Sequence, residues 1–339
     1  MVDGPAEADA ALTRRGQLFR MRDLAKHALA LYGVEPASLS LLAHFYHTTF
    51  KVTGTDGTRH VLHILRPEDE PITEERSRAR VRSELWWLDR LRQDLKLVLP
   101  QVERTRGGEG VVSVAVEGLS PRRCTLFRWI DGRFLFQGLA PVHLEAVGRL
   151  TALLHDHSES LTVPSEFDRP RVDRADAETE ESLIRLFGEF SAEAATAMRD
   201  VMRRVRGVQE ELGEGPSEFG LIHADIHQKN YLFNKGQVGL IDFGDCGWGY
   251  HLYDFAVTIN ETSFVPRGRE LRAALLNGYR RVRDLSADDE ARIDSFVMLR
   301  RVQDLTWFLS ERDNPNLKRL TAGIGERVRV LQRMLLDDG

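Results

Sequence analysis

Two short polar runs hold the residues whose types and spacing suggest chemistry. The first is His223–Asn230 (HADIHQKN), and the second is Ile241–Gly244 (IDFG). Between them, two β-like segments, Tyr231–Phe233 and Val238–Ile241, flank the turn sequence Asn234–Gly236. A turn of this kind between two such segments predicts a β-hairpin. The two polar runs therefore meet at the open end of one hairpin.

Three residues of these runs form a chemical set. Asn230 and Asp242 stand at nearly equal distances from the turn, so antiparallel pairing brings them together. An amide oxygen and a carboxylate at one point suit Mg²⁺, a hard cation that takes a few protein oxygens beside substrate phosphates. Asp225 lies on the loop that enters the same end, where its carboxylate can accept a proton from a hydroxyl group. The set predicts phosphoryl transfer.

The spacing H-x-D-x-x-x-x-N, followed by a D-F-G-like step, resembles the catalytic loop and metal-binding motif of kinases. Longer stretches are similar to the aminoglycoside phosphotransferase and choline kinase-like group, and they occur in the order that this group shows. These stretches are Ser83–Leu88, Leu154–Ser158, Leu221–His227 and Ile241–Asp254. The resemblance implies an α+β, two-lobed protein-kinase-like fold, with a small antiparallel-sheet N-lobe and a mostly helical C-lobe.

The resemblance also implies roles for the polar residues. Asp225 is similar to the catalytic base that orients the acceptor hydroxyl, and Asn230 and Asp242 are similar to the two metal ligands. His223 resembles the histidine that braces the catalytic loop, and Asp254 resembles the carboxylate that fixes this loop from behind. The implied cofactors are ATP and Mg²⁺.

A nucleotide site is implied in the first part of the chain. The residues similar to the hinge that holds adenine through backbone groups are Phe127, Arg128, Trp129 and Ile130. The chain departs from the kinase pattern in having no glycine-rich phosphate loop, because the corresponding turn, Leu42–Thr49, reads LAHFYHTT. Backbone amides or the hydroxyls of Thr48 and Thr49 would have to cover the phosphates instead.

A second departure concerns His63, which stands where kinases place a phosphate-contacting lysine. Glu84 falls inside the apolar stripe of its helix, where a carboxylate is costly unless it is paired. One interpretation pairs Glu84 with His63, which would keep the imidazole protonated as a weaker substitute for lysine. The alternative leaves His63 neutral and packed, with Glu84 reaching water or an arginine such as Arg66.

The resemblance implies an enzyme, an ATP-dependent phosphotransferase that moves the γ-phosphate to a hydroxyl of a small molecule such as an amino alcohol, a sugar or an aminoglycoside. Two alternatives stay open: a pseudokinase-like nucleotide-binding module that lost transfer activity at His63, and a kinase acting on protein Ser or Thr. A dinuclear metallohydrolase is disfavoured, because its ligands would have to converge and His155 and His157 point to different helix faces. Its ligands would come from His155-Asp156-His157 together with His223, Asp225 and His227. The sequence does not identify the acceptor, which depends on the variable helices.

The elements that position these residues follow from hydrophobic periodicity. Residues 15–130 are expected to form the N-lobe, an antiparallel sheet of about five strands with one long helix, Thr73–Leu95, inserted. Residues 131–339 are expected to form the C-lobe, with the catalytic loop and the acceptor site. Residues 1–14 are expected to be a disordered leader.

Composition excludes several other classes. The 339 residues are 42% hydrophobic, and 47 Lys and Arg against 52 Asp and Glu give a net charge of −5. This charge offers no basic footprint for nucleic acid, and no apolar run reaches the ~20 residues that cross a bilayer. Cys124 and Cys246 form no CxxC pair, which favours a reducing compartment. We therefore expect a cytoplasmic protein with a small-molecule partner, of undetermined oligomeric state.

Overall fold

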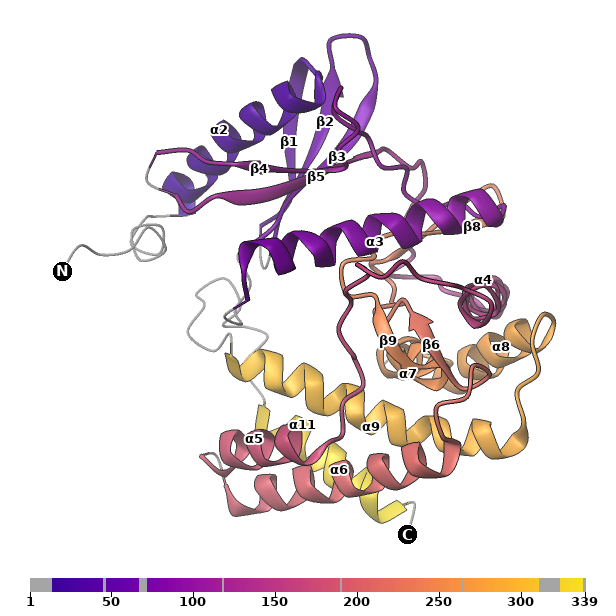
Figure 1. Cartoon of the computed structure of the whole chain (residues 1–339). Helices are drawn as coiled ribbons and strands as arrows, with labels where there is room; N and C mark the ends of the chain where they lie inside the picture. Colours follow the sequence, from indigo (N-terminus) through magenta and orange to yellow (C-terminus); the bar gives the residue numbers. More distant parts are fainter. Residues whose placement is uncertain are drawn as a thin grey trace. The chain divides into compact units, whose positions relative to one another are not determined.

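The computed structural model describes residues 14–44, 47–66, 72–117, 119–189, 191–263, 265–310 and 324–337. The chain divides into two compact units, and each is described by itself (Figure 1). Unit 1 comprises Met1–Asp131 and Pro164–Asp168, and unit 2 comprises Gly132–Val163 and Arg169–Gly339. The expected leader, residues 1–14, lies outside the described residues except for Arg14, which begins a helix.

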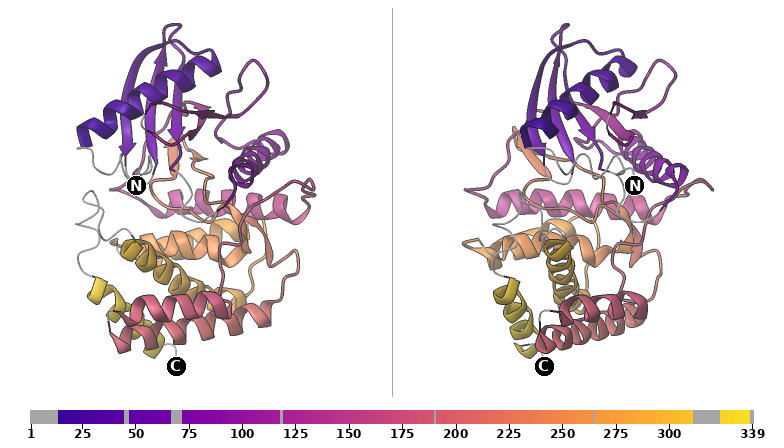
Figure 2. Two further views of the ribbon diagram at one scale, coloured as in Figure 1. Left: turned by 60° about the vertical axis from the view of Figure 1, so that its left-hand side comes forward. Right: turned by 90° about the vertical axis from the view of Figure 1, so that its left-hand side faces the viewer.

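Unit 1 contains an antiparallel five-stranded sheet in the order β1-β2-β3-β5-β4, which confirms the expected small sheet. The strands are β1 Pro36–His44, β2 Thr48–Gly54, β3 Arg59–Ile64, β4 Val111–Val114 and β5 Arg122–Arg128. Helix α2 (Arg14–Tyr32) lies along one face of this sheet, as both views of Figure 2 show. The core between them contains buried Leu24 and Leu29 of the helix and Phe50 and Leu62 of the sheet.

Local sequence explains the turn between β2 and β3. The side chain of Asp56 accepts hydrogen bonds from the Thr58 amide, at 3.0 Å, and from the Thr58 hydroxyl, at 2.6 Å. Gly57 adopts a left-handed conformation with φ of 81°, which costs glycine little. The Asp-Gly step therefore fixes the register of this hairpin, as such steps commonly do.

Helix α3 (Glu74–Asp94) completes unit 1. Its first turn is capped by Thr73, whose hydroxyl accepts the Arg76 amide at 3.2 Å. The apolar stripe expected from the sequence is buried, and its members are Val81, Leu85, Leu88 and Leu91.

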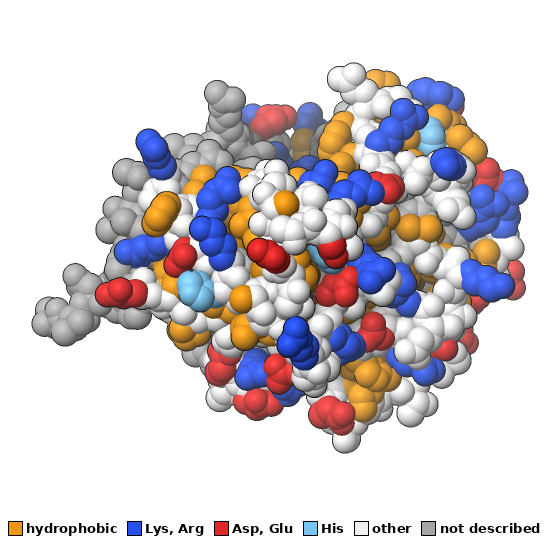
Figure 3. Space-filling model, turned by 90° about the horizontal axis from the view of Figure 1, so that it is seen from above, with side chains coloured by type: hydrophobic (Ala, Val, Ile, Leu, Met, Phe, Trp, Pro, Cys, Tyr) orange, Lys and Arg blue, Asp and Glu red, His pale blue; other side chains and the backbone are white. Residues whose placement is uncertain are grey.

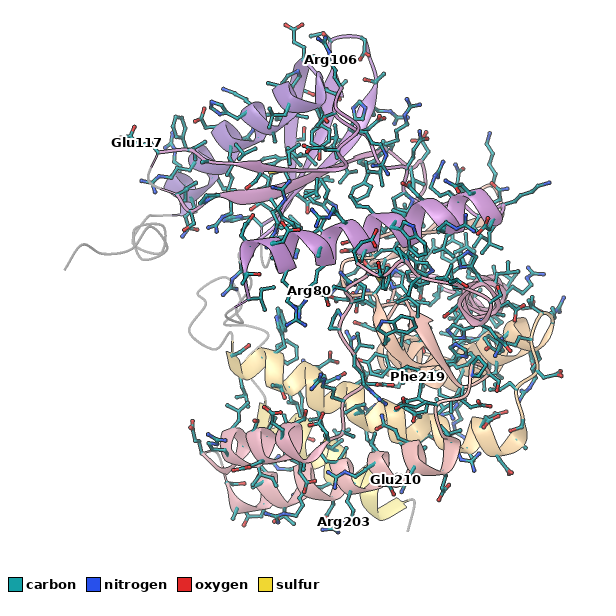
Figure 4. All side chains as sticks on the ribbon, in the orientation of Figure 1. Arg80, Arg106, Glu117, Arg203, Glu210 and Phe219 are labelled. Carbon is teal, nitrogen blue, oxygen red and sulfur yellow. The ribbon has the colours of Figure 1, made fainter. Side chains whose placement is uncertain are left out.

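Unit 2 is mostly helical, which confirms the fold class. Its helices are α4 Pro141–Glu159, α5 Ala177–Gly188, α6 Ala192–Leu212, α7 His251–Thr262, α8 Gly268–Arg280, α9 Ala287–Ser310 and α11 Ile324–Asp337. Its strands are β6 Phe219–Ile222, β7 Tyr231–Asn234, β8 Gln237–Leu240 and β9 Gly247–Tyr250. Helix α6 is amphipathic, because Met198 and Val205 on one side are buried while Arg203 and Glu210 are exposed (Figure 4). Such a helix packs its apolar side against the rest of the unit.

Strand β9 was not expected from the sequence, because Gly247 and Gly249 interrupt the apolar pattern of a strand. It pairs antiparallel with β6, with Phe219 opposite Tyr250 and Ile222 opposite Gly247. A Cβ atom at Gly249 would lie 2.7 Å from Cδ1 of Ile222, so the glycine allows the two strands to approach. This pairing sets the start of α7 beside β6, which leads into the first polar run.

The surface and the helices add two observations. Basic and acidic side chains are interspersed on the face seen in Figure 3. In the described part of the chain, no helix combines the length and the apolar character that crossing a membrane requires.

Helices α4 and α8 pack closely through two glycines. A Cβ atom at Gly148 would lie 1.9 Å from the Leu275 carbonyl oxygen, and one at Gly278 would lie 2.1 Å from the Glu145 carbonyl oxygen. Both obstacles are backbone atoms, so a side chain at either position requires the two helices to separate.

We therefore expect Gly278→Ala to destabilise the protein by ~1–3 kcal/mol, the usual cost of overpacking. Gly207→Ala on α6 is the matched control, because a Cβ atom there meets nothing within 4 Å. The control should stabilise by ~0.5–1 kcal/mol through helix propensity. Denaturant unfolding measures both, and equal stability of Gly278→Ala and the native chain would contradict the close packing.

Candidate active site

The predicted hairpin is formed by β7 and β8, with Tyr231 opposite Leu240 and Asn234 opposite Gln237. Its turn residues Lys235 and Gly236 have φ of 49° and 80°, the pair of positive values that a type I′ turn requires. At the open end the Ile241 amide donates to the Asn230 carbonyl at 2.8 Å. The pairing thus continues past the strands and sets Asn230 beside the residue that precedes Asp242.

The Asp225 carboxylate accepts three hydrogen bonds. Its Oδ1 accepts from Nη2 of Arg300 at 2.9 Å, and its Oδ2 accepts from Nδ2 of Asn230 at 2.7 Å and pairs with Nε2 of His227 at 3.1 Å. Burial tends to raise the pKa of Asp225, but the hydrogen bond and charge of His227 and the charge of Arg300 outweigh it and hold this pKa below its usual range. Asp225 is therefore an anion at neutral pH.

Asn230 is buried and has a defined orientation. Its Nδ2 donates to the backbone carbonyl of Asp225 at 3.0 Å as well as to the Asp225 carboxylate. The orientation of an amide follows from such a network, and here the nitrogen is the atom that bonds to Asp225. Its Oδ1 thus remains for another partner, and a carbonyl oxygen is a ligand type that Mg²⁺ accepts.

Asp242 has a left-handed backbone, with φ of 64°, and its side chain reaches solvent. The surrounding protein and the nearby carboxylates of Asp245 and Asp225 raise the pKa of Asp242 to about 7. A left-handed non-glycine residue is strained and is typical of functional sites. A divalent cation would offset the repulsion among these acids, so the donor set of Asp242 and Asn230 fits Mg²⁺.

His223 joins the two polar runs. Its Nδ1 accepts the Asp225 amide at 3.2 Å, so Nε2 carries the proton and donates to the Ile241 carbonyl at 3.2 Å. Its ring contacts Phe243 with centroids 4.6 Å apart. Burial lowers the pKa of His223, which keeps the ring neutral and suits this pair of bonds.

Asp254, at the start of α7, holds the same loop from behind. Its carboxylate accepts the amides of His223 at 3.1 Å and Ala224 at 2.7 Å. It also bonds to Nε2 of His155 at 3.2 Å, and Nδ1 of His155 bonds to the Tyr279 hydroxyl at 3.0 Å. Ala224 needs this support because its backbone is left-handed, with φ of 65°.

The described residues include no group of three or more His, Cys, Asp or Glu side chains placed to hold a metal ion. His155, which the metallohydrolase alternative would use as a ligand, bonds instead to Asp254 and Tyr279.

A family model for the phosphotransferase enzyme family matches residues 39–294. The chain belongs to this family. A homoserine kinase of Sinorhizobium medicae is 29% identical over 199 residues, which span 57% of this chain and 57% of that relative. The matched segment thus spans little more than half the length of that relative.

Two solved structures resemble the chain along most of its length. A microcompartment-associated aminopropanol kinase superposes with a TM-score of 0.74 and 29% identity, covering 94% of this chain and 98% of the other. An amicoumacin kinase in complex with AMP-PNP and Ca²⁺ superposes with a TM-score of 0.75 at 19% identity, covering 96% of each chain, a likeness of fold. The chain is thus a phosphotransferase of the small-molecule kinase type, with a protein-kinase-like fold.

The two residues expected to assist the nucleotide lie in unit 1. His63 lies on β3, half-buried, with its ring 5.4 Å from that of Phe127, and Glu84 lies half-buried on α3. Burial lowers the pKa of His63 to about 4, so the ring is neutral at neutral pH. Burial therefore disfavours His63 as a cation held by Glu84 and favours the neutral, packed alternative. A contact of either residue with nucleotide stays a prediction.

The hinge-like segment, Phe127–Ile130, begins with the last two residues of β5. The Arg128 amide donates to the Gln101 carbonyl at 2.8 Å, and the Trp129 amide donates to the Arg59 carbonyl at 2.9 Å. These two amides are thus engaged within unit 1. Adenine would have to use the carbonyl groups of this segment or the amide of Ile130.

Sequence reasoning missed Arg300, on α9, which contacts Asp225 from 75 positions further along the chain. A signal existed, because Arg300 follows the buried residues Ile293 and Phe296 at helical spacing. The same reasoning that singled out Glu84, a charge within an apolar stripe, would have singled out Arg300.

Because protonation of His63 requires a pH near 4, its charge does not change between pH 6 and 9. We expect the dissociation constant of Mg-ATP to be flat over that range, and His63→Lys to bring no gain at alkaline pH. His27→Lys, at an exposed position on α2, controls for added charge. Calorimetric titration measures all three proteins, and affinity that falls toward pH 9 only in the native chain would contradict the neutral ring.

Proposed function

We propose that this chain is an ATP- and Mg²⁺-dependent kinase that transfers the γ-phosphate to the hydroxyl of a small amino alcohol or amino-acid alcohol. Asp225 is the catalytic base, Asn230 and Asp242 hold the metal, and the nucleotide is bound through unit 1. Family membership and the likeness to an aminopropanol kinase over nearly the whole chain support this assignment.

The observation that carries the proposal is the state of the Asp225 carboxylate. It is 14% exposed and ionised, and three hydrogen bonds fix its orientation. A carboxylate offers about four acceptor positions, so about one remains for the hydroxyl of an acceptor. Phosphoryl transfer depends mainly on positioning the nucleophile, which an anchored anion with one vacant acceptor position does well.

The metal would be held by Oδ1 of Asn230 and the carboxylate of Asp242. When bound, Mg²⁺ supplies positive charge that neutralises phosphate oxygens. The surrounding protein and the neighbouring acids raise the pKa of Asp242 to about 7, and a divalent cation bound there would offset this repulsion.

The nucleotide contacts are proposed from unit 1. Adenine would meet the segment Phe127, Arg128, Trp129 and Ile130, chiefly through carbonyl groups and the Ile130 amide. His63 and Glu84 lie on β3 and α3 and are proposed to line the phosphate side, with His63 acting as a neutral hydrogen-bonding group. An arginine such as Arg66 would then carry the positive charge.

An acceptor that carries an ammonium group is supported by the charge around the base. The carboxylates of Asp245 and Asp304 interact electrostatically with Asp225, and Glu261 interacts with His227. Such a negative environment attracts an acceptor that carries a positive charge, and it exerts no comparable attraction on a neutral sugar. The similar proteins include a homoserine kinase and an aminopropanol kinase, and homoserine and aminopropanol both carry an amino group beside a hydroxyl.

The test is a transfer assay on the purified chain with ATP and Mg²⁺. The acceptors are 1-amino-2-propanol, ethanolamine, L-homoserine, an aminoglycoside, glucose and a Ser/Thr peptide, with ³¹P NMR to identify the product. We expect transfer to one of the first three. Transfer only to the peptide would support a protein kinase, and Mg-ATP binding without any transfer would support a pseudokinase.

Two variants test the assigned residues. Asp225→Asn should keep the dissociation constant of Mg-ATP while kcat falls ~10²–10⁴-fold, since a general base contributes that much. Asp242→Asn should abolish the Mg²⁺-dependent activity while the thermal stability of the chain without ligands is kept. Asp284→Asn, at an exposed position, is the control and should match the native chain. Normal turnover in Asp242→Asn would refute the metal assignment.

A further inference from the structure

Both terminal nitrogens of the Arg300 guanidinium group, on α9, donate hydrogen bonds to the loop that carries Asp225. Nη1 donates to the Ala224 carbonyl at 3.2 Å, and Nη2 donates to Oδ1 of Asp225 at 2.9 Å. Its side chain is 19% exposed, so these charge-assisted bonds form away from bulk water. One arginine therefore holds both the backbone and the side chain of neighbouring loop residues.

The backbone that it holds is strained. Ala224 is left-handed, with φ of 65°, a conformation that is unfavourable for a residue with a Cβ atom. Asp254 holds the amide of Ala224 from one side, at 2.7 Å, and Arg300 holds its carbonyl from the other. The two peptide units on either side of Ala224 are thus held from two helices, the first by Asp254 of α7 and the second, which leads into Asp225, by Arg300 of α9.

Arg300 is itself fixed on its own helix. Its Nε pairs with Oδ1 of Asp304 at 2.9 Å, and Oδ2 of Asp304 accepts Nδ2 of Asn260 at 2.9 Å. The guanidinium group therefore has a partner on each of its three nitrogens. Because all three of its nitrogens bond to the protein, the guanidinium group holds the loop in place and is poorly placed to bind the acceptor.

We propose that Arg300 is a positioning residue, which clamps the Ala224–Asp225 step and so aims the catalytic carboxylate. The catalytic part of this inference rests on the proposed function, and the clamp itself does not. The role requires the planar fork of arginine, because a lysine ammonium cannot bond the Ala224 carbonyl and the Asp225 carboxylate with the same parallel geometry.

The first experiment needs neither nucleotide nor acceptor. Amide hydrogen exchange is measured on the native chain, Arg300→Met, Arg300→Lys and Arg272→Met. Arg272→Met is the matched control, because Arg272 also forms an ion pair with α9 away from the loop. The distance from its Nη1 to Oδ1 of Asp294 is 2.5 Å. In Arg300→Met we expect amides of residues 223–230 to exchange ~10-fold faster or more, the effect of losing a charge-assisted hydrogen bond. Exchange elsewhere should change no more than in the control.

The second experiment measures kinetics with 1-amino-2-propanol and with L-homoserine. Arg300→Met should lower kcat by about 10²-fold, the cost of misplacing a reacting group, while the dissociation constant of Mg-ATP stays within about twofold. Arg300→Lys keeps the charge and one bond, so its kcat should lie between those of Arg300→Met and the native chain. Arg272→Met should keep the native kcat.

The outcomes separate this inference from the proposed function. If the native chain transfers phosphate to neither acceptor while loop exchange rises only in the Arg300 variants, the acceptor assignment fails and the clamp holds. Exchange that rises equally in Arg300→Met and Arg272→Met would show a general structural role and overturn the inference. Native kcat in Arg300→Met or in Arg300→Lys would also overturn it, since the fork would then be unnecessary.

Discussion

The buried carboxylate of Asp254 is the group on which the rest of the site depends. It has no exposed surface, and burying such a group is costly unless its oxygens are bonded. The His223 and Ala224 amides and the His155 ring supply those bonds. The left-handed turn at Ala224 aims both amides at one carboxylate, so the strained loop and the buried acid stabilise each other.

Charge compensation explains why Asp225, the proposed base, is held by side chains from three parts of unit 2. An ionised Asp225 that is mostly buried needs donors, and they come from the loop itself, the hairpin entrance and α9. The pKa values of two histidines of the same loop shift in opposite directions. Burial lowers the pKa of His223, whereas His227, despite its burial, has its pKa raised by the bond to Asp225. His223 therefore braces the backbone as a neutral group, and the carboxylate of Asp225 favours the protonated form of His227.

Predictions from the sequence succeeded where a feature depends on neighbouring residues. The Asp56-Gly57 turn and the buried stripe of α3 follow from local hydrogen bonding and helical spacing, and both were expected. Strand β9 was missed, because its glycines suit a close approach to Ile222 that only the pairing with β6 creates. Likewise, the inclusion of residues 164–168 in unit 1 depends on long-range contacts, such as the bond between the Asp168 amide and Ser83.

The sequence by itself determined the order and the local geometry of Asp225, Asn230 and Asp242. A two-stranded hairpin with a tight turn has one register, and that register brings its flanking residues together. Only the tertiary structure decided the charge on His63 and the contact of Arg300 with Asp225. Both features depend on which distant side chains pack around His63 and exclude water from it, or donate hydrogen bonds to Asp225. Solvation and charge pairing of this kind are properties of the packed chain, and residue spacing does not encode them.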